Sequence, residues 1–232
     1  METRSVEDAR LADLVQILAH RISSLTAGVH GYADLLADTV ATTEQRKLIG
    51  GIVQGTSRID NVLSDLRRFA RPISACPVYL PVDRLLGNTL LLIAEPFRGR
   101  FSIANDVSAD LRLYADPDLS RQALFAILQN ALEASYQRSD VRLHARDGGR
   151  GIVEIAVENE GTPILPEEAP RIFDPFFTTK AQNLGLGLTV ARKIAREQGG
   201  SVELASAAHD VTTRIVLSIP AQMVGRSVFA PN

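Results

Sequence analysis

The first 70 residues carry a repeating pattern of apolar side chains, and this pattern limits the possible folds of the chain more than any other feature. Apolar residues recur at alternating spacings of four and three, which is typical of helices that pack along a seam. The two series are Leu11, Val15, Leu18, Ile22, Leu25, Val29, Tyr32 and Leu36, and then Leu48, Ile52, Gly55, Ile59, Val62, Leu66 and Phe69. The spacing predicts a helix over Val6–Asp38 and a second helix with Thr43 as its N-cap.

A short polar loop joins the two predicted helices, so we expect an antiparallel hairpin. Two helices have too little core to be stable alone, and Gly50, Gly51 and Gly55 each lower helix stability by about 1 kcal/mol. Association of two chains into a four-helix bundle would bury the seam, so a homodimer is expected. In this register His20 falls at heptad position f, which faces away from the bundle core.

Prolines at positions 72, 77 and 81 interrupt the pattern and indicate a domain boundary. Beyond it, the pattern predicts helices at 82–97, 117–137 (opened by Asp116) and 187–198, and strands at 101–107, 141–145, 152–158, 202–205 and 214–219. Helices and strands mix without regular alternation, which favours an α+β two-layer sandwich. The expected organisation is a hairpin over 1–71, a linker over 72–81, a sandwich domain over 82–221 and a tail over 222–232.

Composition excludes several classes of function. The net charge of −2 argues against a nucleic-acid partner. No apolar stretch approaches the ~20 residues that a membrane helix needs, and the N-terminus lacks a signal-peptide core, so we expect a cytoplasmic protein without membrane segments. The single cysteine, Cys76, has no partner for a disulfide. His144 and His209 have no acidic or cysteine partners at metal-ligand spacing, and we assign no metal to them or to His30, which falls at heptad position b.

Two features could carry chemistry. An exposed imidazole at His20 has a free lone pair at neutral pH and can act as a nucleophile, although an ordinary surface histidine would fit the same spacing. Gly185 and Gly187 precede a predicted helix, whose N-terminal N–H groups could hold phosphates. The same glycines would also fit plain turn chemistry. Lys180 lies beside two threonines in the stretch before these glycines, as in a lid over a nucleotide.

Five segments follow one another along the chain: HRISSLTAGVHGYADLL, YADPDLSRQALFAILQNALEAS, VENEGTPI, IFDPFFTTK and NLGLGLTVARKIAREQGGSVEL. In this order they resemble the bacterial two-component histidine kinases across nearly the whole chain. In that family a dimeric helical hairpin carries the phosphoaccepting histidine, and a sandwich domain of the kind shared with gyrase and Hsp90 binds ATP and Mg²⁺. The resemblance therefore implies ATP and Mg²⁺ as cofactors, and a homodimer with a response-regulator receiver domain as partner.

The resemblance also implies roles for individual residues. His20 matches the phosphoacceptor, and Asn130 matches the asparagine that binds magnesium. Residues 173–180 match the segment before the ATP lid. The implied cofactor-binding residues are Asn130, Glu133, Asn159, Gly161, Thr179, Lys180, Gly185, Gly187 and Thr213.

Several positions depart from the family pattern. The acidic residue that serves as general base after the phosphoacceptor is Arg21 here, and a guanidinium cannot accept a proton from the imidazole. Ser24 occupies a position that usually holds threonine or asparagine and is linked to phosphatase action. The aspartate that accepts a hydrogen bond from the adenine amino group is Asn159, whose amide oxygen can accept but carries no charge.

These departures affect two separate requirements of autophosphorylation, the proton acceptor and the adenine contact. The main hypothesis is therefore a degenerate kinase, with weak or lost ATP and Mg²⁺ binding, that acts through His20 as a histidine phosphotransferase or as a docking protein for a response regulator. One alternative is an active ATP-dependent autokinase, favoured by the intact FDPFFTTK and GLGLGL segments. Another is a non-catalytic dimeric scaffold.

Overall fold

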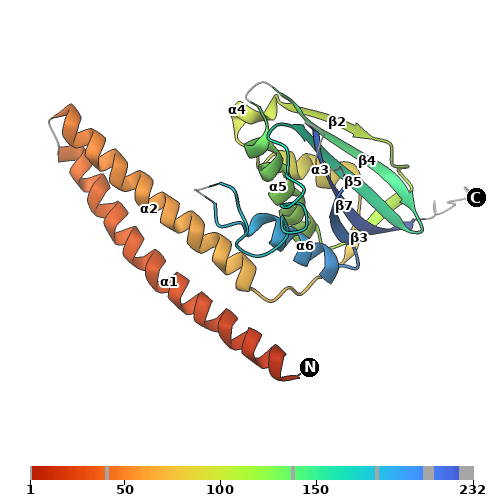
Figure 1. Ribbon diagram of the computed structural model, residues 1–232, viewed down its shortest axis with the longest axis horizontal. Helices are drawn as coiled ribbons and strands as arrows, with labels where there is room; N and C mark the ends of the chain where they lie inside the picture. The colour runs from red at the N-terminus through yellow and green to blue at the C-terminus, as the bar shows by residue number, and fades with distance from the viewer. Residues whose placement is uncertain (1, 40–41, 137–138, 181–182, 206–211, 225–232) are drawn as a thin grey trace, which may run out of the picture. The chain divides into compact units, whose positions relative to one another are not determined.

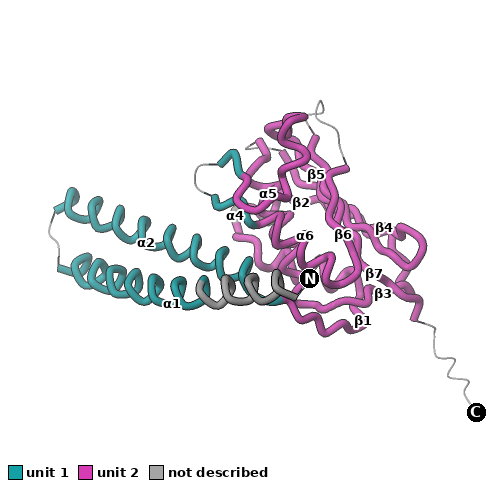
Figure 2. Tube along the Cα trace, turned by 60° about the horizontal axis from the view of Figure 1, so that its bottom comes forward, with its two compact units in different colours: residues 1–72, 178–186 teal, residues 73–177, 187–232 magenta. Residues whose placement is uncertain are grey.

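The structure is a computed structural model of the 232-residue chain. It describes residues 2–39, 42–136, 139–180, 183–205 and 212–224. These residues form two compact units, coloured separately in Figure 2. The first unit comprises residues 1–72 and 178–186, and the second comprises residues 73–177 and 187–232.

Two long antiparallel helices, α1 (Glu2–Thr39) and α2 (Thr43–Ala70), make up most of the first unit (Figure 1). The N-cap of α2 is Thr42, and the prediction of Thr43 for this role was wrong. The hydroxyl of Thr42 accepts a hydrogen bond from the backbone N–H of Gln45 at 3.2 Å, and the Thr42 N–H donates to the Gln45 side chain at 3.3 Å. This reciprocal capping box needs Gln45 at the third helical position, which selects Thr42.

The two helices contact each other through side chains that lie one position away from each apolar series. Ala19, Thr26 and Ala33 of α1 are buried, as are Ile49, Thr56 and Leu63 of α2. The apolar series itself stays open to solvent in the single chain. We call this surface the seam face, and its exposed large residues are Leu18, Ile22, Leu25, Val29, Tyr32 and Leu36 of α1 with Leu48, Ile52 and Ile59 of α2.

Polar contacts also join the two helices across this buried face. The Thr26 hydroxyl donates to Oδ1 of Asp60 at 2.6 Å. Nδ1 of His30 lies 3.2 Å from the Thr56 hydroxyl. Because these pairs combine short polar side chains with buried alanines, the two backbones can approach closely while the larger apolar side chains point elsewhere.

The second unit contains one seven-stranded sheet. Its strands are β1 (Val78–Leu80), β2 (Phe101–Asn105), β3 (Leu111–Ala115), β4 (Val141–Gly149), β5 (Ile152–Glu160), β6 (Ser201–Leu204) and β7 (Thr212–Met223). The strand order is β1-β3-β7-β5-β4-β2, and β6 also pairs with β7. The β2–β4 pair is parallel and the other pairs are antiparallel.

Helices cover one face of this sheet (Figure 1). They are α3 (Val82–Leu90), α4 (Glu95–Arg98), α5 (Pro117–Ala134) and α6 (Gly187–Glu197). As predicted, Asp116 caps α5, and its carboxylate accepts from the N–H groups of Asp118 and Leu119, both at 3.0 Å. The core between α5, its neighbours and the sheet contains Leu85, Leu124, Ile127, Leu128, Ile155, Ile194 and Leu217, each at most 2% exposed.

The opposite face of the sheet carries charged side chains. Glu158 of β5 forms ion pairs with Arg142 of β4 at 3.4 Å and with Arg214 of β7 at 3.0 Å. One face therefore packs against helices and the other is polar, so the unit has two layers. The prediction of a helical region followed by an α+β two-layer sandwich is confirmed.

Three element boundaries differ from the prediction. The helix expected over 82–97 is two helices, because α3 ends at Leu90 and α4 begins anew at Glu95, with Pro96 in its first turn. Part of the expected linker 72–81 forms β1, which pairs with the unpredicted strand β3. Strand β7 continues to Met223, beyond the expected domain end at 221, and residues 225–232 of the expected tail lie outside the described residues.

Gly161 lies where the end of β5 meets the end of α5. The N–H of Thr162 donates to the carbonyl of Ala134 at 3.2 Å, and Gly161 forms a β-bridge with Ser135. A Cβ atom at position 161 would lie 1.9 Å from the Ala134 carbonyl oxygen. Only glycine allows the two backbones to come this close.

We therefore expect Gly161→Ala to lower the free energy of unfolding by about 1–3 kcal/mol, because the added methyl group must push β5 away from α5. Gly87→Ala is the matched control, since a Cβ atom at this position of α3 meets nothing within 4 Å. In that helix alanine should raise stability by up to about 1 kcal/mol. Thermal or urea unfolding of the two variants measures both effects. Equal stability of both variants would contradict this account of Gly161.

Candidate functional site

The first candidate group lies on the hairpin, around His20 of α1. His20 is exposed, as its heptad position predicted, and Arg21 and Ser24 are exposed as well. Among the described residues, no carboxylate forms a hydrogen bond or an ion pair with His20. The imidazole is thus accessible to a reacting group from outside the chain, and the side chain next to it cannot remove its proton.

Arg67 of α2 contacts the same helical turn, and the sequence reasoning missed it. One guanidinium nitrogen, Nη2, donates to the backbone carbonyl of Ala19 at 2.7 Å and to the Ser23 hydroxyl at 2.8 Å. Arg67 follows the buried Leu63 by four positions, which places it on the contact face of α2. That spacing could have indicated the residue, but a search for large apolar side chains passes over it.

The second candidate group lies at the end of β5 in the sandwich. Asn159 is 2% exposed and belongs to the core-facing series of β5, in which Val153, Ile155 and Val157 are also buried. Its register partners are Val141 of β4 and Thr213 of β7, and Thr213 is buried too. The sheet therefore places two polar residues, Asn159 and Thr213, side by side on its otherwise apolar face.

Asn159 has an unmet hydrogen-bonding group. Its Nδ2 atom is fully buried and has no hydrogen-bond partner in the described part of the chain. An unpaired buried amide costs roughly 1–3 kcal/mol, so such a group needs an explanation. A ligand that supplies an acceptor is one explanation.

Asn130 and Glu133 lie near the C-terminal end of α5. Asn130 is half-buried and Glu133 is exposed. Asn130 precedes Ala134 by about one helical turn, and Ala134 is the residue whose carbonyl meets Gly161. Asn130, Asn159 and Gly161 are thereby held at the same end of the sandwich, as the α5 and β5 contacts require.

Helix α6 begins at Gly187, another predicted residue. The Thr189 hydroxyl in its first turn donates to the Phe173 carbonyl at 3.0 Å, and the Arg192 guanidinium lies 4.8 Å from the centre of the Phe173 ring. These contacts fix the start of α6, whose first N–H groups are suited to an anion. Phe173 is buried, as a core aromatic would be.

The remaining predicted residues belong to the segment 178–186, which groups with the first unit. The Thr178 hydroxyl accepts from the Lys180 N–H at 3.0 Å and makes a tight local turn. Thr179 is exposed, and Gly185 has a φ of 68°, a left-handed conformation that favours glycine. Residues 181–182 of the predicted lid lie outside the described residues.

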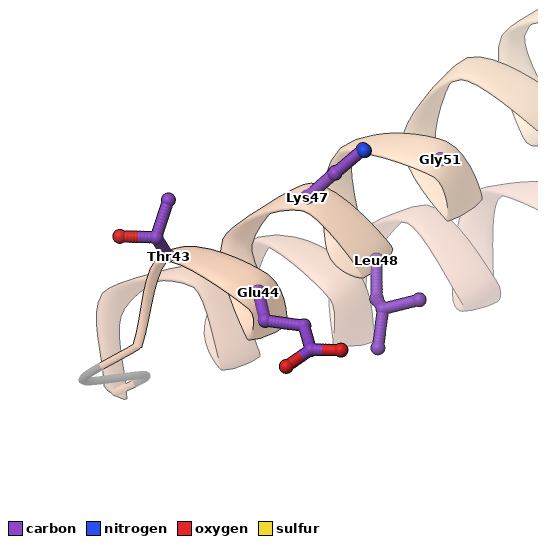
Figure 3. Close-up of a pocket in the computed structure, with 5 residues that line it drawn as sticks. All are labelled: Thr43, Glu44, Lys47, Leu48 and Gly51. Carbon is purple, nitrogen blue, oxygen red and sulfur yellow. The ribbon is translucent and has the colours of Figure 1, made fainter.

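A hollow of about 680 Å³ lies at the start of α2 and contains none of the predicted site residues. Its lining consists of Thr43, Glu44, Lys47, Leu48 and Gly51 (Figure 3). Figure 3 shows the Lys47 side chain pointing away from those of Glu44 and Leu48, so the polar atoms do not converge on a ligand. Leu48 belongs to the seam face, and the hollow is part of that surface.

Metal-ligand clusters and membrane-spanning helices are both absent from the described residues. No group of three or more His, Cys, Asp or Glu side chains in the described ranges is arranged to hold a metal ion. No helix within those ranges combines the length and apolar character needed to cross a membrane.

Residues 115–223 match the family model described as "Histidine kinase-, DNA gyrase B-, and HSP90-like ATPase". The chain is 30% identical over 202 residues to the sensor histidine kinase ZraS of Escherichia coli (strain K12), covering 84% of this chain and 43% of ZraS. It is also 30% identical over 224 residues to the C4-dicarboxylate transport sensor protein DctB of Rhizobium meliloti (strain 1021), covering 91% and 36%. The chain thus spans less than half the length of these relatives.

Solved structures of histidine kinases are also similar to this chain. The catalytic domain of histidine kinase ThkA is 31% identical with a TM-score of 0.56, over 62% of this chain and 95% of that domain. Full-length ShkA, solved in complex with AMPPNP, shares the fold with a TM-score of 0.73 at 24% identity, over 91% of this chain and 46% of ShkA. A helical region followed by this sandwich, together with the family model and the relatives, shows that the chain belongs to the histidine kinase superfamily of two-component signal transduction.

Proposed function

We propose that the protein is a dimeric histidine phosphotransfer protein, in which His20 exchanges a phosphoryl group with the aspartate of a response-regulator receiver domain. Its autokinase activity with ATP is slow. The observation that carries this proposal is the exposed imidazole of His20 with Arg21, rather than a carboxylate, as its neighbour. We place this activity in the cytoplasm, as the sequence analysis expected.

The donor determines how much the missing base matters. In the exchange, the unprotonated imidazole nitrogen attacks the phosphorus of the aspartyl phosphate, an N–P bond forms, the P–O bond to the carboxyl group breaks, and the proton on the other ring nitrogen passes to water. The carboxylate that leaves is the anion of an acid with a pKa of about 4, so it is a better leaving group than the terminal phosphate of ADP, whose second pKa is about 6, and the transfer depends less on a base. Transfer from ATP gains more from a general base beside the histidine, and such a base contributes typically 10²–10⁴-fold.

Two guanidinium groups support a phosphoryl group on His20. Arg21 follows it directly, and Arg67 is held beside the same turn by its hydrogen bonds to the Ala19 carbonyl and the Ser23 hydroxyl. Positive charge near the phosphorylated imidazole stabilises the added negative charge. Ser24, one turn after His20, is the residue that would contact a water or a receiver group next to the phosphate.

The seam face supports the dimer. Leu25 and Tyr32 are 71% and 72% exposed in the single chain, and the other members of the seam face continue the same stripe along both helices. A stripe of this length exposes more apolar surface than soluble monomers usually carry. A second copy of the hairpin would cover it, forming a four-helix bundle with His20 on the outside.

The sandwich domain carries the residues that would bind a nucleotide. The bound nucleotide would act as a phosphoryl donor or as an effector. Asn159 and Thr213 would contact the base, Asn130 and Glu133 would hold Mg²⁺ through the phosphates, and Gly185, Gly187, Thr179 and Lys180 would bind the phosphates. The unpaired Nδ2 of Asn159 fits a bound group that supplies a hydrogen-bond acceptor. Because Asn159 is neutral, we expect ATP to bind about tenfold more weakly than it would with a carboxylate at this position.

The second candidate is an active autokinase. Its support is the likeness to sensor kinases, the intact phosphate-binding segments and the AMPPNP complex of ShkA. In that case water would take the proton that Arg21 cannot accept. A dimeric scaffold without phosphotransfer is the third. The phosphorylation experiments below separate all three.

The first experiment tests the dimer. Light scattering should give about twice the chain mass of 25.2 kDa. Leu25→Asp, in the middle of the seam face, should yield monomers, because a buried unpaired charge costs several kcal/mol. Ala27→Asp is the control, since Ala27 is exposed and lies at heptad position f, outside the seam face. A monomeric wild-type protein at micromolar concentration would disprove the dimer.

The second experiment tests the phosphoacceptor with a phosphorylated receiver domain as donor. His20→Ala should abolish phosphohistidine formation and change the free energy of unfolding by no more than ~0.5 kcal/mol, because His20 is exposed. His30→Ala is the control, since it removes the half-buried histidine that lies 3.2 Å from the Thr56 hydroxyl. Labelling should persist in that variant. Unchanged labelling of His20→Ala would show that another residue carries the phosphate.

The third experiment separates the two departures from the family pattern. Asn159→Asp should improve ATP affinity about tenfold without restoring phosphorylation, because the proton acceptor is still missing. Arg21→Glu should raise the rate of phosphohistidine formation at every ATP concentration and leave ATP affinity unchanged. In the double variant the gain in ATP affinity should equal that of Asn159→Asp, and the gain in rate should equal that of Arg21→Glu. Time courses at several ATP concentrations measure both. Fast autophosphorylation of the unaltered protein would favour the active kinase.

A further inference from the structure

Asn159 joins two properties that are rarely found in one side chain. It is 2% exposed on the core-facing side of β5, and its Nδ2 donor has no hydrogen-bond partner among the described residues. Buried amides are normally paired, so this one is suited to a partner from outside the chain. If the sandwich binds a nucleotide as proposed above, that partner is the edge of the base.

An amide and a carboxylate select different partners. The carboxylate of an aspartate can only accept hydrogen bonds, so it favours a base that presents an N–H group. The amide of Asn159 offers an N–H₂ donor beside a carbonyl acceptor. Rotation of the amide by 180° exchanges the two positions. The side chain can therefore meet a donor next to an acceptor in either order.

The two kinds of purine differ in this order. A 6-aminopurine, such as adenine, presents an N–H donor at C6 and an acceptor at N1. A 6-oxopurine, such as hypoxanthine or guanine, presents an acceptor at C6 and an N–H donor at N1. The Asn159 amide can pair with both edges by rotating, whereas an aspartate would place an anion against the carbonyl oxygen of the 6-oxopurine.

The strand neighbours of Asn159 carry no charge that would fix the order of donor and acceptor. Thr213, its register partner on β7, carries a hydroxyl that can donate or accept. Glu158 and Glu160 flank Asn159 along β5, but they alternate to the opposite face, where Glu158 pairs with Arg142 and Arg214 and Glu160 pairs with Arg142. Val141, the partner on β4, is apolar and buried. No charged side chain of these three strand ends faces the amide.

We infer that the base site of this protein binds 6-oxopurine nucleotides nearly as well as 6-aminopurine nucleotides, because the neutral amide of Asn159 reads the edge of the base. This inference deepens the proposed function and rests on the nucleotide site in it. It gives the nucleotide domain a broader substrate class, the purine nucleotides as a whole.

ADP and IDP are the sharpest pair of probes, since they differ only at C6 and in the protonation of N1. Calorimetry on the 232-residue chain with Mg²⁺ should give dissociation constants for ADP and IDP within about tenfold of each other. In Asn159→Asp the ADP affinity should rise and the IDP affinity should fall, so that the preference for ADP reaches at least about a hundredfold. Asn88→Asp makes the same chemical change at an exposed position of α3 and should leave the ratio at its wild-type value.

Each result has a distinct meaning. If the wild-type protein binds ADP at least about a hundredfold more tightly than IDP, the inference is overturned while nucleotide binding stands. If neither nucleotide binds at millimolar concentration, the nucleotide site of the proposed function fails, and the inference fails with it. A shift of the ratio in Asn88→Asp would show that Asn159 is not responsible. If thermal unfolding shows that Asn159→Asp does not fold, the wild-type comparison of ADP with IDP decides alone.

Discussion

The close approach of β5 to the end of α5 at Gly161 is the constraint on which the sandwich site depends. No residue with a side chain fits there, because a Cβ atom would lie 1.9 Å from the Ala134 carbonyl oxygen. This approach holds Asn159, two residues earlier on the strand, at the same end of the sandwich as Asn130, one turn earlier on the helix. The buried amide of Asn159 and the half-buried Asn130 are thus placed by backbone packing, independently of any ligand.

The hairpin uses small side chains in a comparable way. Ala19 and Ala33, each 1% exposed, let α1 approach α2 closely, and Thr26 and Asp60 are joined by a hydrogen bond in the same interface. Because this contact face lies one position away from the large apolar residues, α1 has three separate surfaces. One packs on α2, one is the seam face that we assign to a second copy, and the third carries His20. The phosphoacceptor can then be exposed on a helix that is packed on two sides.

Much of this arrangement could be predicted from the sequence, and the failures have physical causes. Heptad spacing predicted both long helices and the exposure of His20, because a period of 3.5 residues determines direction on a helix. It did not reveal the contact face, because alanine and threonine carry little weight in a pattern of large apolar residues. Strands β1 and β3 were missed, and β1 lies between Pro77 and Pro81 in the stretch that the prolines marked as a linker. The order of the motif segments indicated the family, but the unpaired Nδ2 of Asn159 depends on packing across three strands, which no local pattern records.

The central claim is that His20 receives its phosphoryl group from a receiver domain more readily than from ATP. The most direct test follows phosphohistidine formation on the unaltered protein with the two donors in parallel, using a phosphorylated receiver domain in one reaction and saturating Mg·ATP in the other. The account predicts labelling at His20 with both donors, with the initial rate from ATP lower by at least about a hundredfold, the contribution expected of the missing general base. Equal rates with the two donors, or labelling from ATP alone, would contradict it.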